Sequence, residues 1–357
     1  SDFTIKDIFK DIHFKGGFNI KGYRFYGIGA NNKDALLNVY RDVEVVRNSD
    51  TIIENMLFMT SRSQTFVFTD KMIMSQDAKM SIKLEDDSLY HPGLQMTYLH
   101  QNKEFSLMRS DNAINMSQSP FYDSYHKFEV DVPLVKWKVG EKLIYFTSLQ
   151  NSAINNAKFL SYNLFNRQFF DMFQGFDWQH PFYKIRAFLH KNQRETYQAS
   201  EIGQILHQAE HEARKFLLQL TYLGFTDYDK TTKTGRMKDK FYDYLEYVVG
   251  RKDYDIIHIE STTEGRENAV LNLRNMDFYV NGVPQIHISN AKRVNIYPKH
   301  DEIVIKQNRD ISFAGVIETG YYTFYGRNFH FKYNKFGVDL EHIDSLHIKV
   351  VDYLDNY

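Results

Sequence analysis

The chain has 357 residues, which is long enough for about two or three domains, and 43% of them are hydrophobic. Its 44 Lys and Arg residues nearly balance its 45 Asp and Glu residues, so the composition gives no basis for binding DNA or an anionic membrane surface. The absence of cysteine excludes disulfides, thiol catalysis and Cys-ligated zinc or iron–sulfur clusters.

Residues 12–150 are predicted to form successive β-strands. Polar and apolar residues alternate in the segments 65–69, 80–84 and 128–132, as they do in strands with one buried face. Turn-forming residues separate the strands at Asn31-Asn32, Asp86-Asp87, His91-Pro92-Gly93 and Asn102-Lys103. A short strand recurs about every 8–12 residues, which is the spacing of a sandwich, a barrel or a solenoid.

In the middle of the chain the hydrophobic period changes to that of helices. Apolar residues fall at helical spacing in three groups: Phe182, Ile185, Phe188 and Leu189; Ile202, Ile205 and Leu206; Ala213, Phe216, Leu217 and Leu220. Pro181 opens the first group, at the position where a helix needs no N–H donor. The aromatic segment 159–180 precedes these helices, and we expect it to pack them onto the sheets.

Residues 181–240 resemble a winged helix-turn-helix domain. The resemblance rests on helices expected at 181–191, 198–206 and 209–223, with a short strand at Thr196-Tyr197. Gly224 suits the left-handed position that closes a helix, and Gly224-Phe225 matches the ending typical of the family. The resemblance implies a wing at 227–240 with Gly235 at its tip.

Strand patterning returns from residue 255 to the end of the chain. The alternating segments are 257–259, 271–273, 286–288, 303–305 and 329–331. Residues 12–27 and 311–326 share seven of sixteen positions, including Phe-Tyr-Gly. This similarity predicts an internal repeat in which Phe25 and Phe324 face the same way. The alternative is that strands rich in Tyr and Phe look alike through composition.

Together these patterns predict a mainly β fold with an α-helical insert, in which β-sandwich or β-solenoid-like flanks surround a winged-helix-like unit. We expect a β-rich domain at 1–158, the helical insert at 159–250, and a second β-rich domain at 251–357 that repeats the first. No run of about 18 apolar residues is present, so no membrane-crossing helix is expected.

Nucleic-acid binding by the insert would use the basic residues of the wing. The candidate contacts are Lys230, Lys233, Arg236 and Lys238. Glu210 and Glu212 in the first turn of the third helix would repel phosphate. Residues 181–250 contain eleven Lys and Arg against nine Asp and Glu, which is a weak charge excess for a duplex-binding domain. We therefore predict no specific DNA binding and a structural or protein-contact role for the insert.

The sequence shows no catalytic motif, and we assign no catalytic, cofactor-binding or metal-ligating residue. His207 and His211 have the spacing of two metal ligands but straddle the predicted turn. His287, His330 and His347 alternate with apolar residues and should face outward. Acid–base residue types occur in Asp86-Asp87 with His91 and in Asp123-Ser124-Tyr125-His126, both of which are typical of turns.

Three segments carry a wider resemblance: Tyr90-His91-Pro92-Gly93, Ser124-Tyr125-His126-Lys127 and Leu223-Gly224-Phe225. With β flanks around a small winged-helix unit, the chain is similar to parts of large, uncharacterised β-rich envelope proteins of Gram-negative bacteria. This resemblance implies a part of a larger protein. The first residues show neither an initiator Met nor a signal-peptide pattern, so we expect a fragment or a processed chain.

The sequence thus predicts a non-enzymatic structural or protein-interaction module of a larger, envelope-associated protein. Its expected partners are other proteins or the rest of a larger chain. A Cys-free composition fits an extracytoplasmic location, in the periplasm or at the outer membrane, although codon bias would produce it as well. The alternatives are a nucleic-acid-associated regulator acting through the winged-helix segment and a carbohydrate-binding or carbohydrate-active β protein.

Overall fold

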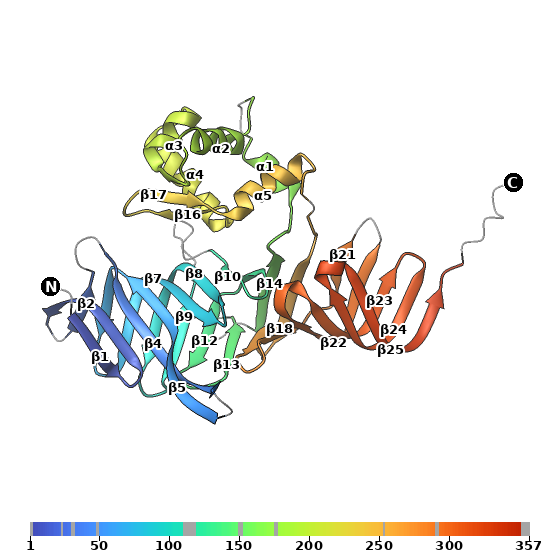
Figure 1. Ribbon diagram of the computed structural model, residues 1–357, viewed down its shortest axis with the longest axis horizontal. Coiled ribbons are helices and arrows are strands. Elements are labelled where there is room, and N and C mark those ends of the chain that lie inside the picture. Colours follow the sequence, from blue (N-terminus) through green and yellow to red (C-terminus); the bar gives the residue numbers. More distant parts are fainter. Residues whose placement is uncertain are drawn as a thin grey trace. The chain divides into compact units, whose positions relative to one another are not determined.

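The computed structural model confirms a mainly β fold with a helical insert (Figure 1). It describes residues 3–22, 24–29, 33–47, 50–109, 119–148, 153–174, 178–252, 254–289 and 293–350. Strands form 58% of the chain, and the helices lie at about 165–250. The chain divides into two compact units. The β unit comprises residues 1–110, 121–161 and 257–357, and the helical unit comprises residues 111–120 and 162–256.

Strands of the β unit lie on both sides of the helical insert in the sequence. Before the insert they are β1 (Phe3–Phe9), β2 (Ile12–Lys21), β3 (Arg24–Ile28), β4 (Ala35–Arg47), β5 (Asp50–Ser63), β6 (Thr65–Phe68), β7 (Met72–Leu84), β8 (Asp87–Leu99), β9 (Glu104–Met108), β10 (Phe121–Asp123), β11 (Phe128–Asp131), β12 (Leu134–Lys138), β13 (Leu143–Thr147) and β14 (Ile154–Ser161). After the insert they are β18 (His258–Glu264), β19 (Ala269–Asn272), β20 (Asp277–Asn281), β21 (Ile286–Ser289), β22 (Val294–Ile305), β23 (Ile311–Thr319), β24 (Tyr322–Lys332) and β25 (Gly337–Ile348).

Six of these strands close an antiparallel barrel. They pair in the cyclic order β2, β3, β6, β7, β5, β4 and back to β2. The ring closes because the two halves of β2 have different partners: residues 12–15 pair with β4 and residues 17–21 pair with β3. A barrel therefore stands here in place of the sandwich or solenoid that we expected. Alternation of polar and apolar residues shows which face of a strand is buried, but not which strands are its neighbours.

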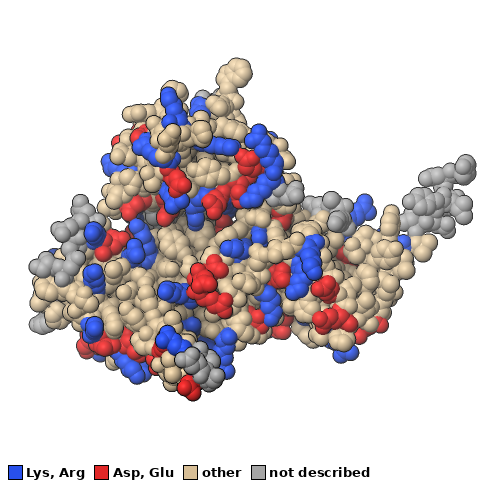
Figure 2. Space-filling model, viewed as in Figure 1, with Lys and Arg blue, Asp and Glu red and all other residues tan. Residues whose placement is uncertain are grey.

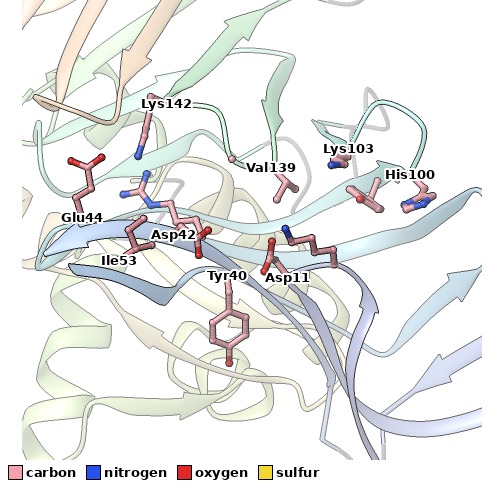
Figure 3. A pocket seen from close by; sticks show the side chains of 13 residues that line it. Asp11, Tyr40, Asp42, Glu44, Ile53, His100, Lys103, Val139 and Lys142 are labelled. Carbon is pink, nitrogen blue, oxygen red and sulfur yellow. The ribbon is translucent and has the colours of Figure 1, made fainter. Parts of the chain in front are cut away.

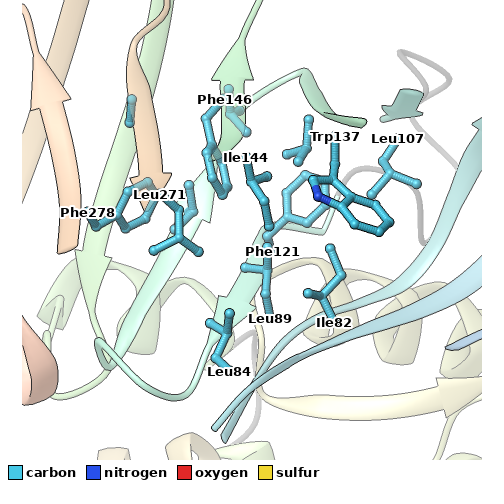
Figure 4. Packing of buried hydrophobic residues seen from close by; sticks show 14 of the residues in the cluster. Ile82, Leu84, Leu89, Leu107, Phe121, Trp137, Ile144, Phe146, Leu271 and Phe278 are labelled. Atoms are coloured by element: carbon cyan, nitrogen blue, oxygen red, sulfur yellow. The ribbon is translucent and has the colours of Figure 1, made fainter. Parts of the chain in front are cut away.

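Beyond the barrel the sheet continues from β8 along two branches. One runs through β9, β12, β13, β19, β20 and β22, and the other through β10, β11, β14 and β18. Apolar side chains from both branches pack together, as Figure 4 shows for Phe121, Trp137, Phe146 and Phe278. The rings of Phe146 and Phe278 are 4.7 Å apart. The segments expected as separate β-rich domains pair with each other through β13–β19 and β14–β18.

The segment His91-Pro92-Gly93 lies inside β8, so the predicted turn there is wrong. The register between β7 and β8 shifts at this point: Met80 is opposite His91, whereas Ala78 is opposite Leu94. Pro92 and Gly93 therefore occupy a bulge, where a proline without an N–H breaks no ladder hydrogen bond. His91 is fully buried and its Nδ1 accepts a hydrogen bond from the Gly93 N–H at 3.1 Å.

The two segments with similar sequences both form antiparallel hairpins, β2–β3 and β23–β24. Their registers differ, since Phe25 is opposite Ile20 whereas Phe324 is opposite Ile317. Phe25 is 49% exposed, while Phe324 is partly buried against the core, so these two side chains lie in different surroundings. Tyr23, like the predicted turn at Asn31-Asn32, lies outside the described residues. The internal repeat remains a prediction.

The helical unit combines α-helices with a three-stranded sheet. Its elements are α1 (Arg167–Met172), α2 (Pro181–Lys191), β15 (Thr196–Gln198), α3 (Ala199–Leu206), α4 (Glu210–Tyr222), β16 (Thr226–Asp229), β17 (Thr234–Met237) and α5 (Asp239–Val248). The helices predicted between residues 181 and 223 are confirmed. Gly224 has φ of 78°, the left-handed conformation expected of it. Among the described residues no helix is long and apolar enough to cross a membrane.

Gly235 does not lie at the tip of the β16–β17 hairpin, as the sequence suggested. It occupies β17, which is the central strand of the three-stranded sheet β15-β17-β16. A Cβ atom at Gly235 would lie 2.7 Å from the Asp227 carbonyl oxygen and would collide with the Tyr197 side chain. Glycine is needed here for close packing of neighbouring strands rather than for a turn.

Candidate functional site

The four basic residues considered as nucleic-acid contacts lie on or beside the β16–β17 hairpin. Lys230 and Lys233 are in the turn, Arg236 is in β17, and Lys238 immediately precedes α5. Lys233 Nζ is 2.9 Å from Glu210 Oε1 on α4, and Arg236 Nη2 is 2.5 Å from Glu195 Oε2. At least two of the four charges are therefore balanced within the helical unit. Figure 2 shows basic and acidic side chains interspersed over the face in view.

The first turn of α4 is acidic. The hydrogen bond from Lys233 lowers the pKa of Glu210, and the Lys215 ammonium, 3.1 Å from Glu212, lowers the pKa of Glu212. Both carboxylates therefore remain charged at neutral pH, and both would repel phosphate. Farther along the helix Leu218 is partly buried against the hydrophobic core that includes Phe170.

The histidines do not assemble a metal site in the described part of the chain. His207 is the C-cap of α3 and has φ of 55°. In α4, His211 Nε2 lies 2.9 Å from Glu212 Oε1. No group of three or more His, Asp or Glu side chains is arranged to hold a metal ion among the residues that the structure describes. His287 is exposed on β21, and its ring Nδ1 lies 2.6 Å from Asn295 Oδ1 on the neighbouring strand.

The turn between β10 and β11 does bring together the acid–base pair that the sequence suggested. His126 Nδ1 is 2.6 Å from Asp123 Oδ2, and His126 Nε2 is 2.7 Å from the Met276 carbonyl oxygen. Two acceptors thus face the two ring nitrogens, which is the arrangement that a doubly protonated imidazolium requires. Burial opposes the charge, but the Asp123 carboxylate and the Met276 carbonyl outweigh it and raise the pKa of His126.

This pair is sealed inside the β unit. Neither side chain has any exposed surface. Asp123 Oδ1 accepts hydrogen bonds from the backbone N–H groups of Tyr125 and His126, so the carboxylate also shapes its own turn. A substrate would have no route to the imidazole, and the pair therefore holds the turn against Met276. The nearby Asp87 carboxylate accepts a hydrogen bond from the Ser124 hydroxyl at 2.8 Å, which is a further turn contact.

One face of the sheet formed by β22–β25 carries a row of apolar side chains whose solvent exposure increases from β22 to β25. The directly paired residues along the row are Ile296, Ile317, Phe324 and Leu346. Ile296 is fully buried and Ile317 is 3% exposed, whereas Leu346 is 44% exposed. The adjacent pair, Tyr322 and Ile348, is 47% and 57% exposed. The face that forms the core farther back in the sheet is thus uncovered at β25.

Strand β25 is also an open edge of the sheet. Within the described residues it pairs with β24 alone, so one side of the strand presents unpaired backbone donors and acceptors. It carries Asp339, Glu341 and Asp344 but no Lys or Arg. The uncovered residues Leu346 and Ile348 were not singled out from the sequence. Their alternation marks one face of a strand, but whether that face is covered depends on the rest of the fold.

Strand β1 is a second open edge, and the two edges lie at opposite ends of the β unit (Figure 1). In the described chain β1 pairs with β2 alone. Phe3 and Ile5 on β1 are 54% and 36% exposed. The hairpin β1–β2 with its turn carries Lys at positions 6, 10, 15 and 21 and Asp at positions 7 and 11. β1 is therefore apolar and carries one Lys and one Asp, and the positive excess of the hairpin lies on β2, whereas β25 is apolar and acidic.

Comparison with known proteins finds no matching protein family, no matching curated protein and no matching solved structure.

Proposed function

We propose that this protein is a non-enzymatic structural module that assembles through its open sheet edges, with β25 of one copy accepting β1 of the next. The observation that carries the proposal is the uncovered row ending at Leu346 and Ile348, because apolar surface that continues a core is stabilised when a partner covers it. Backbone pairing at the free edge would add the directional hydrogen bonds of strand addition.

The choice of a second copy as the partner rests on charge and on geometry. The acidic strand β25 complements the lysine-rich β1–β2 hairpin, and both edges are apolar. Joining two different edges of the same chain is a heterologous contact, which propagates from copy to copy and builds extended assemblies. Such an assembly suits the expected role in a large, extracytoplasmic envelope structure.

Sedimentation velocity over a range of concentrations tests the proposal. The wild-type chain should form species heavier than the 42.4 kDa monomer as the concentration rises to about 100 μM. The double variant Leu346→Lys, Ile348→Lys should remain monomeric. Met172→Lys, Val249→Lys is the matched control, because these side chains are 54% and 49% exposed in the helical unit. A wild-type chain that stays monomeric throughout would overturn the proposal.

Mixing two edge variants identifies the pairing. The variant Phe3→Lys, Ile5→Lys keeps β25 intact, and the variant Leu346→Lys, Ile348→Lys keeps β1 intact. Each should be monomeric alone, and an equal mixture should form a dimer that grows no further. Dimerisation of the β1 variant by itself would instead show that two β25 edges pair with each other, which contradicts the head-to-tail arrangement.

For the helical unit we propose a winged-helix fold with a protein-contact role. The element order of α2, α3, α4 and the β16–β17 hairpin supports the fold. The ion pairs of Lys233 and Arg236 favour a protein contact over a nucleic-acid contact. Carbohydrate binding has less support, since the exposed Tyr322 and Tyr325 alternate to opposite faces of β24.

A further inference from the structure

A cleft of about 330 Å³ opens in the β unit at one end of the strands (Figure 3). Four chain segments line it: the β1–β2 turn, the β4–β5 hairpin, the end of β8 with the turn that follows, and the β12–β13 turn. Its volume lies in the range of small-molecule sites, roughly 300–1,000 Å³. The cleft lies apart from β25 but includes Lys10 and Asp11 of the β1–β2 turn.

Arg41 occupies an unusual position in this cleft. On β4 it continues the inward-facing series of Leu37 and Val39, which are fully buried, so a charged residue stands where the pattern calls for an apolar one. Its guanidinium lies over the ring of Phe58 at 4.2 Å. Arg41 Nη1 is buried and has no hydrogen-bond acceptor in the described protein. Arg41 also makes no ion pair with a described carboxylate, although it lines a cleft that contains Asp42 and Glu44.

Three further cations line the same cleft, namely Lys10, Lys103 and Lys142. None of them makes an ion pair with another described side chain. Asn55 Nδ2 donates to Asp42 Oδ1 at 3.0 Å and to Asp11 Oδ1 at 3.4 Å, which orients these carboxylates and leaves them further lone pairs. The four cations that line the cleft outnumber its three carboxylates, Asp11, Asp42 and Glu44.

Groups that bind hydroxyls lie beside these cations. Tyr98 lines the cleft, and its hydroxyl makes no hydrogen bond within the described protein. Burial raises the pKa of Tyr98, so its phenol stays protonated and can donate. The carboxylates of Asp11, Asp42 and Glu44 are acceptors for the hydroxyl groups of a ligand.

We propose that this cleft binds a small acid, either a carboxylate or a phosphate, that also carries hydroxyl groups. Arg41 and Lys142 receive the acid group, because a guanidinium matches an oxyanion through two parallel hydrogen bonds and an ammonium adds a point charge. Arg41 is held for this task by its packing on Phe58, and the surrounding carboxylates hold the hydroxyl groups.

Isothermal titration calorimetry of the full chain at low salt tests the proposal with three probes that share a sugar ring. Glucuronate carries a carboxylate, glucose 6-phosphate carries a phosphate, and glucose carries neither. We expect binding of one or both acids and weaker or undetectable binding of glucose. The stronger of the two acids identifies the acid group that the cleft prefers.

Variants separate this site from general surface charge. Arg41→Met keeps an apolar stem over Phe58 and should weaken binding of the acid by at least about tenfold, the loss of one charged hydrogen bond. Lys142→Met should weaken it in the same direction and provides a second reading if Arg41→Met fails to fold. Arg47→Met is the matched control, because Arg47 lies on the same strand and pairs with Glu54 at 3.0 Å outside the cleft.

The proposal is overturned if neither acid binds at about 10 mM, a concentration at which even weak charged contacts are detected. It is also overturned if glucose binds as tightly as the acids, or if Arg41→Met and Lys142→Met bind the acids as tightly as wild type does.

Discussion

Replacing Asp123 by Asn should reverse the pH dependence of the stability of the β unit. In the wild type the pKa of His126 is raised above its ordinary value of 6.5. The folded state then binds a proton more tightly than the unfolded state. The resulting stabilisation is complete below about pH 6.5 and is lost as the pH rises through the folded pKa.

In Asp123→Asn the amide has the same shape but no charge. Its oxygen can still accept from the two backbone N–H groups, and its Nδ2 can donate to His126 Nδ1 only if that nitrogen carries no proton. The neutral imidazole then fits, with Nε2–H donating to the Met276 carbonyl. With the carboxylate gone, burial dominates and the pKa of His126 should fall below 6.5. Stability should therefore rise with pH across this range.

The size of the effect follows from the contacts that change. Removing one partner of a buried ion pair costs about 3–5 kcal/mol, but the amide retains the hydrogen bonds of the turn. We therefore expect a loss of about 2 kcal/mol at pH 5.5, near the worth of one charged hydrogen bond. At pH 8.5 the loss of stability should be smaller. The two losses should differ by about 1.4 kcal/mol for each pH unit, between pH 5.5 and pH 8.5, that separates the folded-state pKa of His126 in the wild type from that in Asp123→Asn.

Urea unfolding followed by tryptophan fluorescence measures these values. Trp137 is 1% exposed in the β unit, whereas Trp178 is fully exposed in the helical unit. A Trp178→Phe background therefore leaves one probe for the β unit alone. Asp86→Asn, an isosteric change in an exposed turn, is the control and should leave the pH profile unchanged. If Asp123→Asn keeps the wild-type pH slope, His126 is not charged in the folded protein and the reasoning fails.

Three further predictions follow from individual residues. Arg41→Met should raise the free energy of unfolding, measured in urea titrations, by about 1 kcal/mol. The variant removes an unsatisfied buried donor, which costs about 1–3 kcal/mol, and loses a cation–π contact worth about 0.5–2 kcal/mol. A fall in the free energy of unfolding of more than about 2 kcal/mol would show that Arg41 has a structural role instead. Gly235→Ala should lower the melting temperature of the helices in circular dichroism, by a destabilisation of about 2 kcal/mol, while Gly337→Ala, where the nearest atom is 3.8 Å from the new Cβ, should not. Fluorescence anisotropy with random duplex DNA at about 150 mM salt should detect no micromolar binding; such binding, weakened by neutralising Lys233, Arg236 and Lys238, would refute the protein-contact role.

Local patterns in the sequence determined the type and place of most elements. Alternation predicted strands on both sides of the insert, and helical spacing predicted α2, α3 and α4. These signals depend on which face of a segment is apolar, a property that neighbouring residues carry. The segment Asp123-Ser124-Tyr125-His126 is likewise predicted as a turn, and the turn brings its first and last side chains into contact.

What only the tertiary structure decided is which surfaces meet and which remain uncovered. The closed barrel depends on β2 pairing with both β3 and β4, and the ion pair at the β16–β17 hairpin depends on Lys233 reaching Glu210 on α4. The pattern of β4 shows that Arg41 faces inward, but only the arrangement of four distant segments turns that position into the lining of a cleft. Accessibility is a property of the packed whole, because a side chain is exposed or sealed by residues far away in the chain. For this reason Asp123 and His126 are enclosed while Leu346, on an equally regular strand, is left open.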